Sequence, residues 1–296
     1  MAKIKILITD GMAKEGIDIL KQHPEFEVDL RKSTSAEELA GIIGGYESII
    51  IRSATTLTKD LIEKAANMKL IVRAGAGVDN IDVPTATAKK IPVMNTASAN
   101  SMAAAEQTIA LMFAMLRNIP QAAQTLRDGK WERDSFKGYE ATGKAIAVLG
   151  LGNIGRIVAE RAIGLGMKVI GYDPMVKSVS QVPGRLSKMS EDFTLVATVD
   201  EAMSRANIVT VHVPKNKDTA HLINAERIAK LKKPAFVINC SRGGIVDEKA
   251  VIAALDSGVL AGAAFDVFDK EPPSFPTPLA THAKIAVAPH LGASTF

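Results

Sequence analysis

The 296-residue sequence contains a single cysteine, Cys240, so no disulfide bond can form within the chain. Aromatic residues make up only 4% of it, and the core must therefore be built from Ala, Val, Ile, Leu and Met. The most apolar stretch, 108–116, is far below the roughly 20 residues that a membrane-spanning helix needs. The N-terminus also lacks the apolar stretch of a signal peptide. These absences predict a cytoplasmic protein.

Neither sign of charge is in large excess. The formal net charge of +4 is too small and too evenly spread to indicate nucleic-acid binding. An apolar content of 47% and a charged content of 23% are typical of globular proteins, and the length suits about two domains. We expect no metal, membrane or nucleic-acid partner. The excess of lysine and arginine would suit an anionic small substrate, but composition alone does not show this.

What the sequence does contain is an alternation of short apolar runs with helical patterns, which predicts βαβ units and mostly parallel sheets. A long helix is predicted at 101–116, with Asn100 as its N-cap. The simplest interpretation is two α/β domains divided near residue 99. The predicted strands are 4–9, 48–52, 69–73, 145–149, 168–172, 208–213, 235–239, 261–265 and 285–288.

A glycine-rich turn follows the predicted strand 145–149. Residues 150–155 (GLGNIG) fit G-x-G-x-x-G and open a predicted helix. The glycines permit a tight turn and close approach of a pyrophosphate, and the helix N-terminus offers N–H groups to the phosphates. Asp173, at the end of the next strand, would accept the ribose hydroxyls of NAD and repel the 2′-phosphate of NADP. We predict NAD binding; the alternative is a structural turn with a surface carboxylate.

Hydride transfer at an alcohol carbon would also need a general acid/base, which is usually a histidine. Of five histidines, His290 alone directly follows a predicted strand in a Pro-His-Leu-Gly turn. Ligands of α/β sheets bind beyond the carboxyl ends of strands, which favours His290 as the base. Its position alone leaves a structural role open. The others are expected at the surface or, for His212, in a wall: His23, His212, His221 and His282.

Arg242 and Glu271 occupy comparable places. Arg242 follows the strand 235–239 and precedes two glycines, and its guanidinium could clamp a carboxylate in bidentate fashion. Glu271 follows the strand 261–265, and contact with His290 would favour the imidazolium. On spacing alone, each could equally be a solvent-exposed loop residue.

Three longer motifs around these residues resemble the signatures of the D-2-hydroxyacid dehydrogenase family, and the resemblance extends over nearly the whole chain. They are 239–248 (NCSRGGIVDE), 265–272 (FDVFDKEP) and 289–295 (PHLGAST). The resemblance implies that Arg242 binds and polarises the substrate, that Glu271 tunes the histidine, and that His290 is the acid/base.

The same resemblance implies the domain organisation and the cofactor contacts. It implies two doubly wound domains with a cleft between them, a flavodoxin-like substrate-binding domain at 1–98 and a Rossmann NAD-binding domain at 99–296. Cys240 would line the pocket and not act as a nucleophile. The implied NAD-binding residues are Gly150, Gly152, Asn153, Ile154, Gly155, Asp173, His212, Val213, Pro214, Thr219, Cys240, Ser241, Asp266 and Gly292.

Further strings, 51–55 (IRSAT), 72–80 (VRAGAGVDN) and 129–133 (GKWER), resemble the branch of the family that acts on phosphoglycerate. By that resemblance two arginines would hold the phosphate, the N–H groups of 76–78 the carboxylate, and a third arginine could reach in from a neighbouring subunit. The alternative for each arginine is a solvated charge. The implied substrate-binding residues are Arg52, Ser53, Arg73, Ala76, Gly77, Val78, Asn100 and Arg133.

Three departures from the family stand out. Ala97 replaces a usual proline, and 175–198 looks longer than usual, which predicts a surface loop. The sequence also ends at Phe296, where relatives continue with a helix that returns to the first domain and often with a regulatory domain. We therefore expect either a piece of a longer protein or a short form.

The expected function is NAD-dependent oxidation of D-3-phosphoglycerate to 3-phosphohydroxypyruvate, a step towards serine, by a homodimer or homotetramer. The helix 101–116 is a candidate subunit contact, although burial within the subunit would explain its composition nearly as well. The alternatives are a glyoxylate, hydroxypyruvate or other D-2-hydroxyacid reductase, and an NAD-sensing binding protein that resembles co-repressors.

Overall fold

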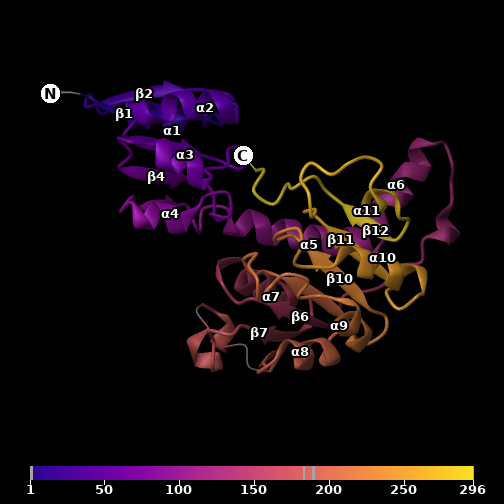
Figure 1. The fold of residues 1–296 in the computed structure, drawn as a ribbon. Helices are drawn as coiled ribbons and strands as arrows, with labels where there is room; N and C mark the ends of the chain where they lie inside the picture. The colour runs from indigo at the N-terminus through magenta and orange to yellow at the C-terminus, as the bar shows by residue number, and fades with distance from the viewer. Residues whose placement is uncertain (1–2, 183, 189–190, 296) are drawn as a thin grey trace. The chain divides into compact units, whose positions relative to one another are not determined.

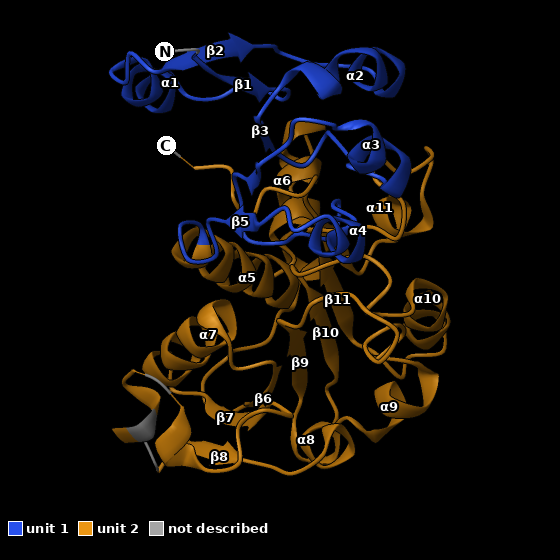
Figure 2. Ribbon diagram, turned by 60° about the vertical axis from the view of Figure 1, so that its left-hand side comes forward, with its two compact units in different colours: residues 1–100 blue, residues 101–296 orange. Residues whose placement is uncertain are grey.

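The computed structural model describes residues 3–182, 184–188 and 191–295. The chain divides into two compact units, unit 1 at Met1–Asn100 and unit 2 at Ser101–Phe296 (Figure 2). The boundary predicted from the sequence, between residues 98 and 99, lies two residues earlier. Each unit holds one sheet with parallel strand pairs, so the predicted α/β class with two doubly wound sheets is confirmed.

Unit 1 is built on a five-stranded sheet in the order β2-β1-β3-β4-β5, which is the flavodoxin-like order. The edge strand β2 and the three-residue β5 were not predicted, although Phe26, Val28 and Leu30 of β2 alternate with charged residues as an edge strand should. The elements are β1 Ile4–Ile8, α1 Lys14–Lys21, β2 Phe26–Leu30, α2 Ala36–Ile42, η1 Ile43–Gly45, β3 Ser48–Ile51, α3 Lys59–Lys64, β4 Leu70–Arg73, α4 Val83–Ala88 and β5 Val93–Asn95.

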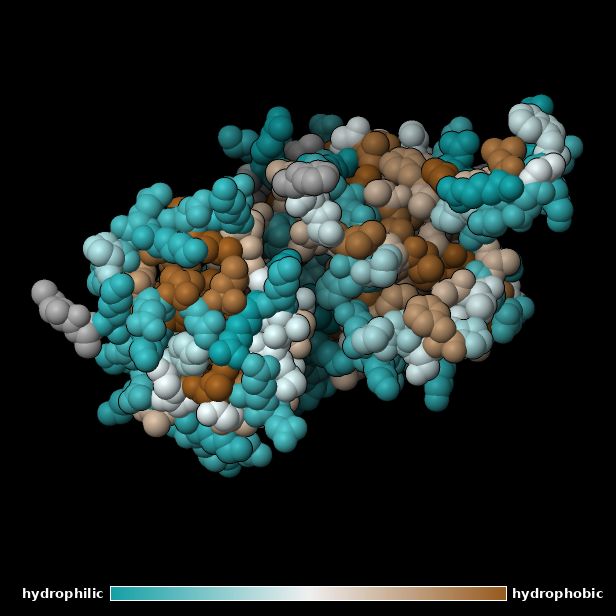
Figure 3. All heavy atoms as spheres, turned by 90° about the horizontal axis from the view of Figure 1, so that it is seen from above, coloured by the Kyte–Doolittle hydropathy of each residue, from teal (hydrophilic) through white to brown (hydrophobic). Residues whose placement is uncertain are grey.

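The apolar core of unit 1 lies on one face of its sheet. Leu7, Ile49 and Ile71 point from the strands into a cluster shared with α2, α3 and α4. Because side chains alternate along a strand, the next residues form a row across the opposite face, in register from Leu30 on β2 to Met94 on β5. The ends of this row are 44% and 57% exposed. Apolar groups thus reach the surface at both ends of this row. Figure 3 shows one face of the molecule, on which hydrophobic and hydrophilic residues are both exposed.

Unit 2 is built on a seven-stranded sheet in the order β12-β11-β10-β9-β6-β7-β8, which contains the Rossmann arrangement around β6 (Figure 1). Its elements are α5 Ser101–Leu116, α6 Ile119–Arg127, η2 Arg133–Ser135, β6 Ala145–Leu149, α7 Asn153–Gly164, β7 Lys168–Tyr172, η3 Val179–Gln181, η4 Leu186–Lys188, β8 Phe193–Leu195, α8 Val199–Arg205, β9 Ile208–Val211, α9 Ala225–Lys230, β10 Phe236–Asn239, α10 Glu248–Asp256, β11 Gly262–Phe265, α11 Pro278–Thr281 and β12 Ile285–Val287.

The sheet of unit 2 is covered by apolar clusters on both faces. One joins alternate strand residues to α8, α9 and α10, and the other joins the intervening residues to α5 and α7. Helix α5 packs on α7, β10, β11 and β12, and its Met112 and Leu116 are fully buried. Burial within the subunit therefore explains the apolar composition of α5.

In the described part of the chain, six of the eleven α-helices begin at a polar residue whose side chain accepts an N–H of the first turn, which typically stabilises a helix by about 1 kcal/mol. Asn100 was predicted to cap α5 in this way, and that prediction is wrong. Its side-chain oxygen is buried and has no hydrogen-bond partner among the described residues. The caps that do form are Ser35, Thr58, Asp82, Thr198, Asn224 and Asp247.

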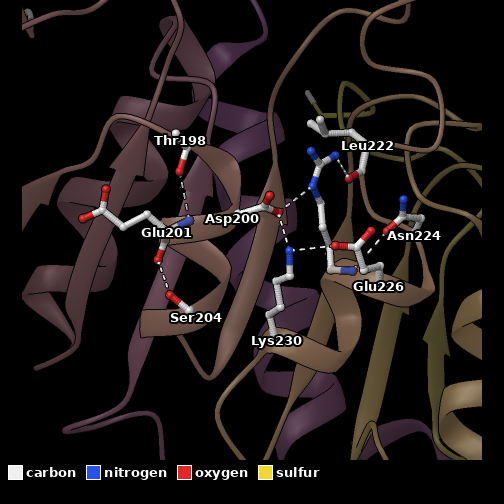
Figure 4. A network of polar contacts seen from close by, with 9 residues as sticks. Thr198, Asp200, Glu201, Ser204, Leu222, Asn224, Glu226 and Lys230 are labelled. Carbon is white, nitrogen blue, oxygen red and sulfur yellow. Dashed lines mark hydrogen bonds and ion pairs between the residues drawn. The ribbon is translucent and has the colours of Figure 1, made fainter.

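An ion-pair network joins α8 to α9 at the surface of unit 2 (Figure 4). Asp200 Oδ1 lies 3.0 Å from Arg227 Nε and 3.3 Å from Lys230 Nζ, and Lys230 also pairs with Glu226 at 2.9 Å. The arginine and lysine lower the pKa of Asp200. This network joins two helices that cover one face of the sheet.

The stretch predicted as a long surface loop, 175–198, lies partly outside the described residues. Its described part contains the short helices η3 and η4 and strand β8, and Val182 and Leu186 are buried in the same cluster as α7. Among the described residues, none of the helices is both long and apolar enough to cross a membrane.

Candidate active site

The glycine turn joins β6 to α7 at the point where the strand order of unit 2 reverses. Gly150 has a left-handed φ of +95°, and a Cβ on Gly155 would lie 1.8 Å from the Gly150 carbonyl oxygen. Both positions therefore require glycine. Nothing lies within 4 Å of a Cβ built on Gly152, the N-cap of the twelve-residue α7. A pyrophosphate could approach the helix N-terminus there.

Asp173, immediately after β7, is tied to this turn. One carboxylate oxygen accepts the Leu151 N–H at 2.9 Å and the other accepts the Met175 N–H at 2.9 Å. Asn153 accepts a hydrogen bond from Arg156 at 3.0 Å. The predicted pyrophosphate and ribose contacts thus form one structured corner of the sheet.

The wall opposite the turn follows β9. The main-chain carbonyl of His212 packs against Gly150, and its Cβ packs against Gly155. These contacts hold the His212 side chain at the turn. Its Nε2 lies 3.0 Å from Thr210 Oγ1, and burial lowers its pKa to about 4. Thr219 closes the wall by donating to the Pro214 carbonyl at 2.7 Å. His212 is therefore neutral near pH 7, and its predicted place in the wall of the NAD site stays a prediction.

The arginine loop follows β10. The buried Asn239 organises it by accepting the Ser241 N–H at 3.1 Å and donating to the Arg242 carbonyl at 2.9 Å. Ser241 also donates to the Val213 carbonyl at 2.8 Å, which joins this loop to the wall. A Cβ on Gly243 would lie 1.8 Å from the Phe268 carbonyl oxygen, so the arginine loop packs directly on the glutamate loop.

Glu271 and His290 form the pair at the centre of the site. His290 Nδ1 lies 2.6 Å from a carboxylate oxygen of Glu271. The other Glu271 oxygen accepts the Phe268 N–H at 3.0 Å. Burial would raise the pKa of Glu271, but the bonds to His290 and Phe268 and the nearby charge of Arg242 outweigh it and lower that pKa. Glu271 is therefore a carboxylate near neutral pH, so His290 Nδ1 carries the shared proton.

Asp266 fixes the turn that carries His290. It is fully buried, and its two carboxylate oxygens accept the N–H groups of Leu291 and Gly292, each at 2.8 Å. Its main-chain carbonyl accepts the His290 N–H at 2.7 Å. Cys240 lies nearby and is buried, and burial raises the pKa of its thiol to about 12. A thiol with that pKa is not a nucleophile at neutral pH.

In unit 1, the residues predicted to bind substrate lie after β3 and β4. Strands β1 and β3 are neighbours although β2 separates them in sequence, so the loop after β3 starts at the point where the order reverses. Asp10 accepts the Arg52 N–H at 2.6 Å and the Thr55 N–H at 3.2 Å. Asn80 donates to the Arg52 carbonyl at 2.7 Å. The exposed Arg52 and Ser53 thus stand on a braced loop.

Arg73 ends β4, and its guanidinium lies over Gly75, at the start of the predicted carboxylate loop 76–78. Asn95 donates to the Ala76 carbonyl at 2.6 Å, which steadies that loop. Arg133 lies on the exposed η2 in unit 2, and Asn100 is the last residue of unit 1. The structure thus groups the NAD and catalytic candidates in unit 2, and most substrate candidates in unit 1.

Four residues that hydrogen-bond to the site loops or to Asp266 were not singled out from the sequence: Asp10, Asn80, Asn239 and Gln107. Each acts through hydrogen bonds to residues distant in sequence or to a loop backbone. Polar residues just after strands could have drawn attention to Asp10 and Asn239, but Gln107 lies inside a helix and gave no local signal.

Taken together, unit 2 is a Rossmann domain in which an imidazole, a carboxylate and a guanidinium meet beyond the strand ends beside a dinucleotide turn. This is the arrangement of a nicotinamide-dependent dehydrogenase. The turn fits the cofactor because Gly152 leaves space at the α7 N-terminus and Asp173 closes the corner. Residues 109–292 match the model described as D-isomer specific 2-hydroxyacid dehydrogenase, NAD binding domain.

Comparison with known proteins agrees. D-3-phosphoglycerate dehydrogenase of Methanocaldococcus jannaschii is 45% identical over 99% of this chain and 54% of its own length. The human protein of the same name is 42% identical over 98% of this chain and 53% of its own length. A crystal structure of a glyoxylate reductase from Paecilomyes thermophila has a TM-score of 0.88 at 26% identity, covering 100% of this chain and 90% of that one.

The chain therefore belongs to the D-isomer specific 2-hydroxyacid dehydrogenase family, and its cofactor is NAD. It spans about half the length of the curated relatives it matches.

Proposed function

We propose that this protein oxidises D-3-phosphoglycerate to 3-phosphohydroxypyruvate with NAD, as a step towards serine. The observation that carries the proposal is the 2.6 Å contact between His290 and Glu271, with the charge of Arg242 acting on the same carboxylate. The curated relatives named D-3-phosphoglycerate dehydrogenase support the choice of substrate.

In the proposed mechanism, the Glu271 carboxylate holds the His290 ring with its proton on Nδ1, which leaves Nε2 to accept the proton of the substrate hydroxyl. Arg242 binds the substrate carboxylate and polarises the oxygen that becomes the carbonyl. NAD, when bound at the glycine turn, supplies the hydride acceptor. Asp173 receives the adenosine ribose and disfavours a 2′-phosphate.

In the proposed recognition of the substrate, Arg52 and Arg73 hold the phosphate and the backbone of 76–78 holds the carboxylate. Asp10 and Asn80 support this by fixing the loop on which Arg52 stands. A phosphate bound by two guanidinium groups would gain charge-assisted hydrogen bonds, which are stronger than neutral ones.

An absorbance assay of NADH formation with a panel of D-2-hydroxy acids tests the proposal. The expected result is turnover of D-3-phosphoglycerate at least about 100-fold above D-lactate and D-glycerate in kcat/KM, the size of two lost charged hydrogen bonds. Preference for a small unphosphorylated acid would favour the alternative reductase, whose fold is shared by the glyoxylate reductase neighbour. NADH binding without turnover of any acid would favour an NAD-sensing protein.

We also propose a homo-oligomer in the cytoplasm. Helix α6 has no buried residue, and its apolar stripe includes Ile119 and Leu126, which are 52% and 58% exposed. Trp131, four residues beyond the helix, is 82% exposed. These residues favour a subunit contact on α6. Helix α5, the contact suggested by the sequence, is apolar because it is buried within the subunit. Sedimentation of Trp131→Glu should show a smaller species than wild type; an unchanged mass would reject this contact.

A further inference from the structure

The turn that carries His290 depends on a single buried carboxylate. The carboxylate of Asp266 accepts the N–H groups of Leu291 and Gly292, and its carbonyl accepts that of His290. One residue directly after β11 therefore holds three successive residues of the histidine motif. The direction of the imidazole follows from these bonds, because they fix the backbone from which it projects.

This backbone would not hold its shape unaided. His290 has a φ of +54°, in the left-handed region that non-glycine residues rarely occupy. Such a conformation persists only where its surroundings fix it. A Cβ on Gly292 would lie 3.2 Å from an Asp266 oxygen, so the turn already lies tightly against the carboxylate. Loss of these hydrogen bonds would release the turn.

A third donor reaches the same carboxylate from a different element. Gln107, on the sixteen-residue helix α5, donates from Nε2 to Asp266 Oδ1 at 3.2 Å. Burial raises the pKa of Asp266, while its hydrogen bonds to Leu291, Gly292 and Gln107 and the charge of His290 oppose that rise. A protonated Asp266 would have one oxygen occupied by hydrogen and could not accept both N–H groups well.

We propose that Gln107 is a positioning residue for His290. Its amide keeps Asp266 an acceptor at both oxygens, and Asp266 then holds the histidine turn. Gln107 does not touch the reacting atoms; it acts from α5 through Asp266. The kinetic consequence rests on the proposed dehydrogenase function, whereas the structural consequence does not.

Besides the Gln107 amide, which does not titrate, two titratable groups face Asp266. The imidazole of His290 lowers its pKa, and the Cys240 thiol, whose own pKa is raised to about 12, stays neutral. The neighbour of Gln107 on α5, Glu106, is engaged elsewhere, 3.0 Å from Arg161. A change with pH in the hydrogen bonds of Asp266 would therefore come from His290 or from the residue that replaces Gln107.

The test compares Gln107→Glu with Gln107→Leu. Glutamate has the same size but cannot donate when ionised, and it repels Asp266; when protonated, it can donate again. Leucine removes the donor without adding charge. The matched control is Gln124→Glu, because Gln124 makes the same kind of amide–carboxylate bond, to Asp128 at 2.8 Å, on an exposed helix surface.

The first measurement is amide hydrogen exchange, which needs no substrate. Protection of the Leu291 and Gly292 amides in Gln107→Glu should fall about 10-fold at pH 8, the effect of one weakened charged bond, and recover as the pH is lowered towards 5. Gln107→Leu should lose protection without recovery. Amides of β10 report global unfolding and should not change. Unchanged protection at Leu291 and Gly292 in both variants, or equal loss at β10, would overturn the proposal.

The second measurement is turnover. In Gln107→Glu, kcat should fall about 10-fold at pH 8 with KM nearly constant, because the bond positions an acid/base and binds no substrate. The loss should diminish at lower pH, and Gln124→Glu should match wild type. A rise in KM without loss of kcat would overturn the positioning role. Wild type that turns over no 2-hydroxy acid would instead reject the proposed function, and the exchange experiment would still decide on Gln107.

Discussion

The two units of this protein are both doubly wound α/β sheets, but they are supported differently. The sheet of unit 2 has an apolar cluster on each face, whereas among the described residues of unit 1 the cluster lies on one face only. The opposite row in unit 1 ends in the exposed Leu30 and Met94. The difference teaches that one doubly wound topology can be packed by a large apolar cluster on each face or by one such cluster on a single face.

The candidate site residues of the two units also differ in how they are held in place. In unit 2, the Glu271–His290 pair and the arginine loop contact one another through side chains and glycine backbones. In unit 1, the hydrogen bonds that other described residues make to Arg52 go to its main-chain N–H and carbonyl, and none goes to its guanidinium. A proton transfer needs atoms fixed within a hydrogen bond, while recognition of a phosphate tolerates mobile cations. We therefore expect changes in unit 2 to alter kcat and changes in unit 1 to alter KM.

The largest expected effect is in unit 2. His290→Ala should lower kcat by about 10²–10⁴-fold, the usual contribution of a general acid/base, with NADH affinity unchanged. Stopped-flow turnover together with NADH fluorescence titration measures both. A wild-type kcat in this variant would show that His290 is not the acid/base. It would also contradict the assignment of catalysis to unit 2.

Core truncation tests whether the units are stabilised separately. Ile71→Ala in unit 1 and Ile238→Ala in unit 2 should each cost about 2–5 kcal/mol, the range for buried Ile→Ala changes. Both side chains are almost fully buried, at 1% and 0% exposure. Because the clusters are confined to their own units, hydrogen exchange should accelerate in unit 1 alone for the first variant. Equal acceleration in both units would show that they unfold together.

Charge reversal tests recognition in unit 1. Arg52→Glu should raise KM for D-3-phosphoglycerate by about 10–100-fold, the equivalent of one lost charged hydrogen bond, and leave kcat within a few-fold. Steady-state kinetics with D-lactate provides the control, since that substrate has no phosphate. A fall in kcat at constant KM would contradict the division of roles between the units.

The smallest expected effect is at the α8–α9 network of unit 2. Asp200→Ala removes two ion pairs, but the Asp200 side chain is 50% exposed and solvent screens both. We expect a loss of about 0.2–1 kcal/mol in urea unfolding and no change in turnover. A much larger loss would mean that surface pairs, and not the two-sided core, distinguish unit 2 from unit 1.

Much of this fold could be predicted from local sequence patterns. Apolar runs located β1, β3 and β4 of unit 1 and all strands of unit 2 except β8. The three-residue strands β5 and β8 were missed because so short a run carries little pattern, and β2 was missed although its apolar and charged residues alternate. The glycine turn was predictable because Gly150 and Gly155 meet steric demands that no other residue satisfies.

By itself, the sequence determined the α/β class, the positions of most strands and the identity of the groups that follow them. Only the tertiary structure decided that Glu271 bonds to His290, that Asn100 does not cap α5, and that Gln107 reaches Asp266 from a helix far away in sequence. The physical reason is range. Turns and strands are determined largely by residues that are close together in the sequence. A hydrogen bond between side chains of separate elements depends on how those elements pack, and no local sequence pattern specifies that packing.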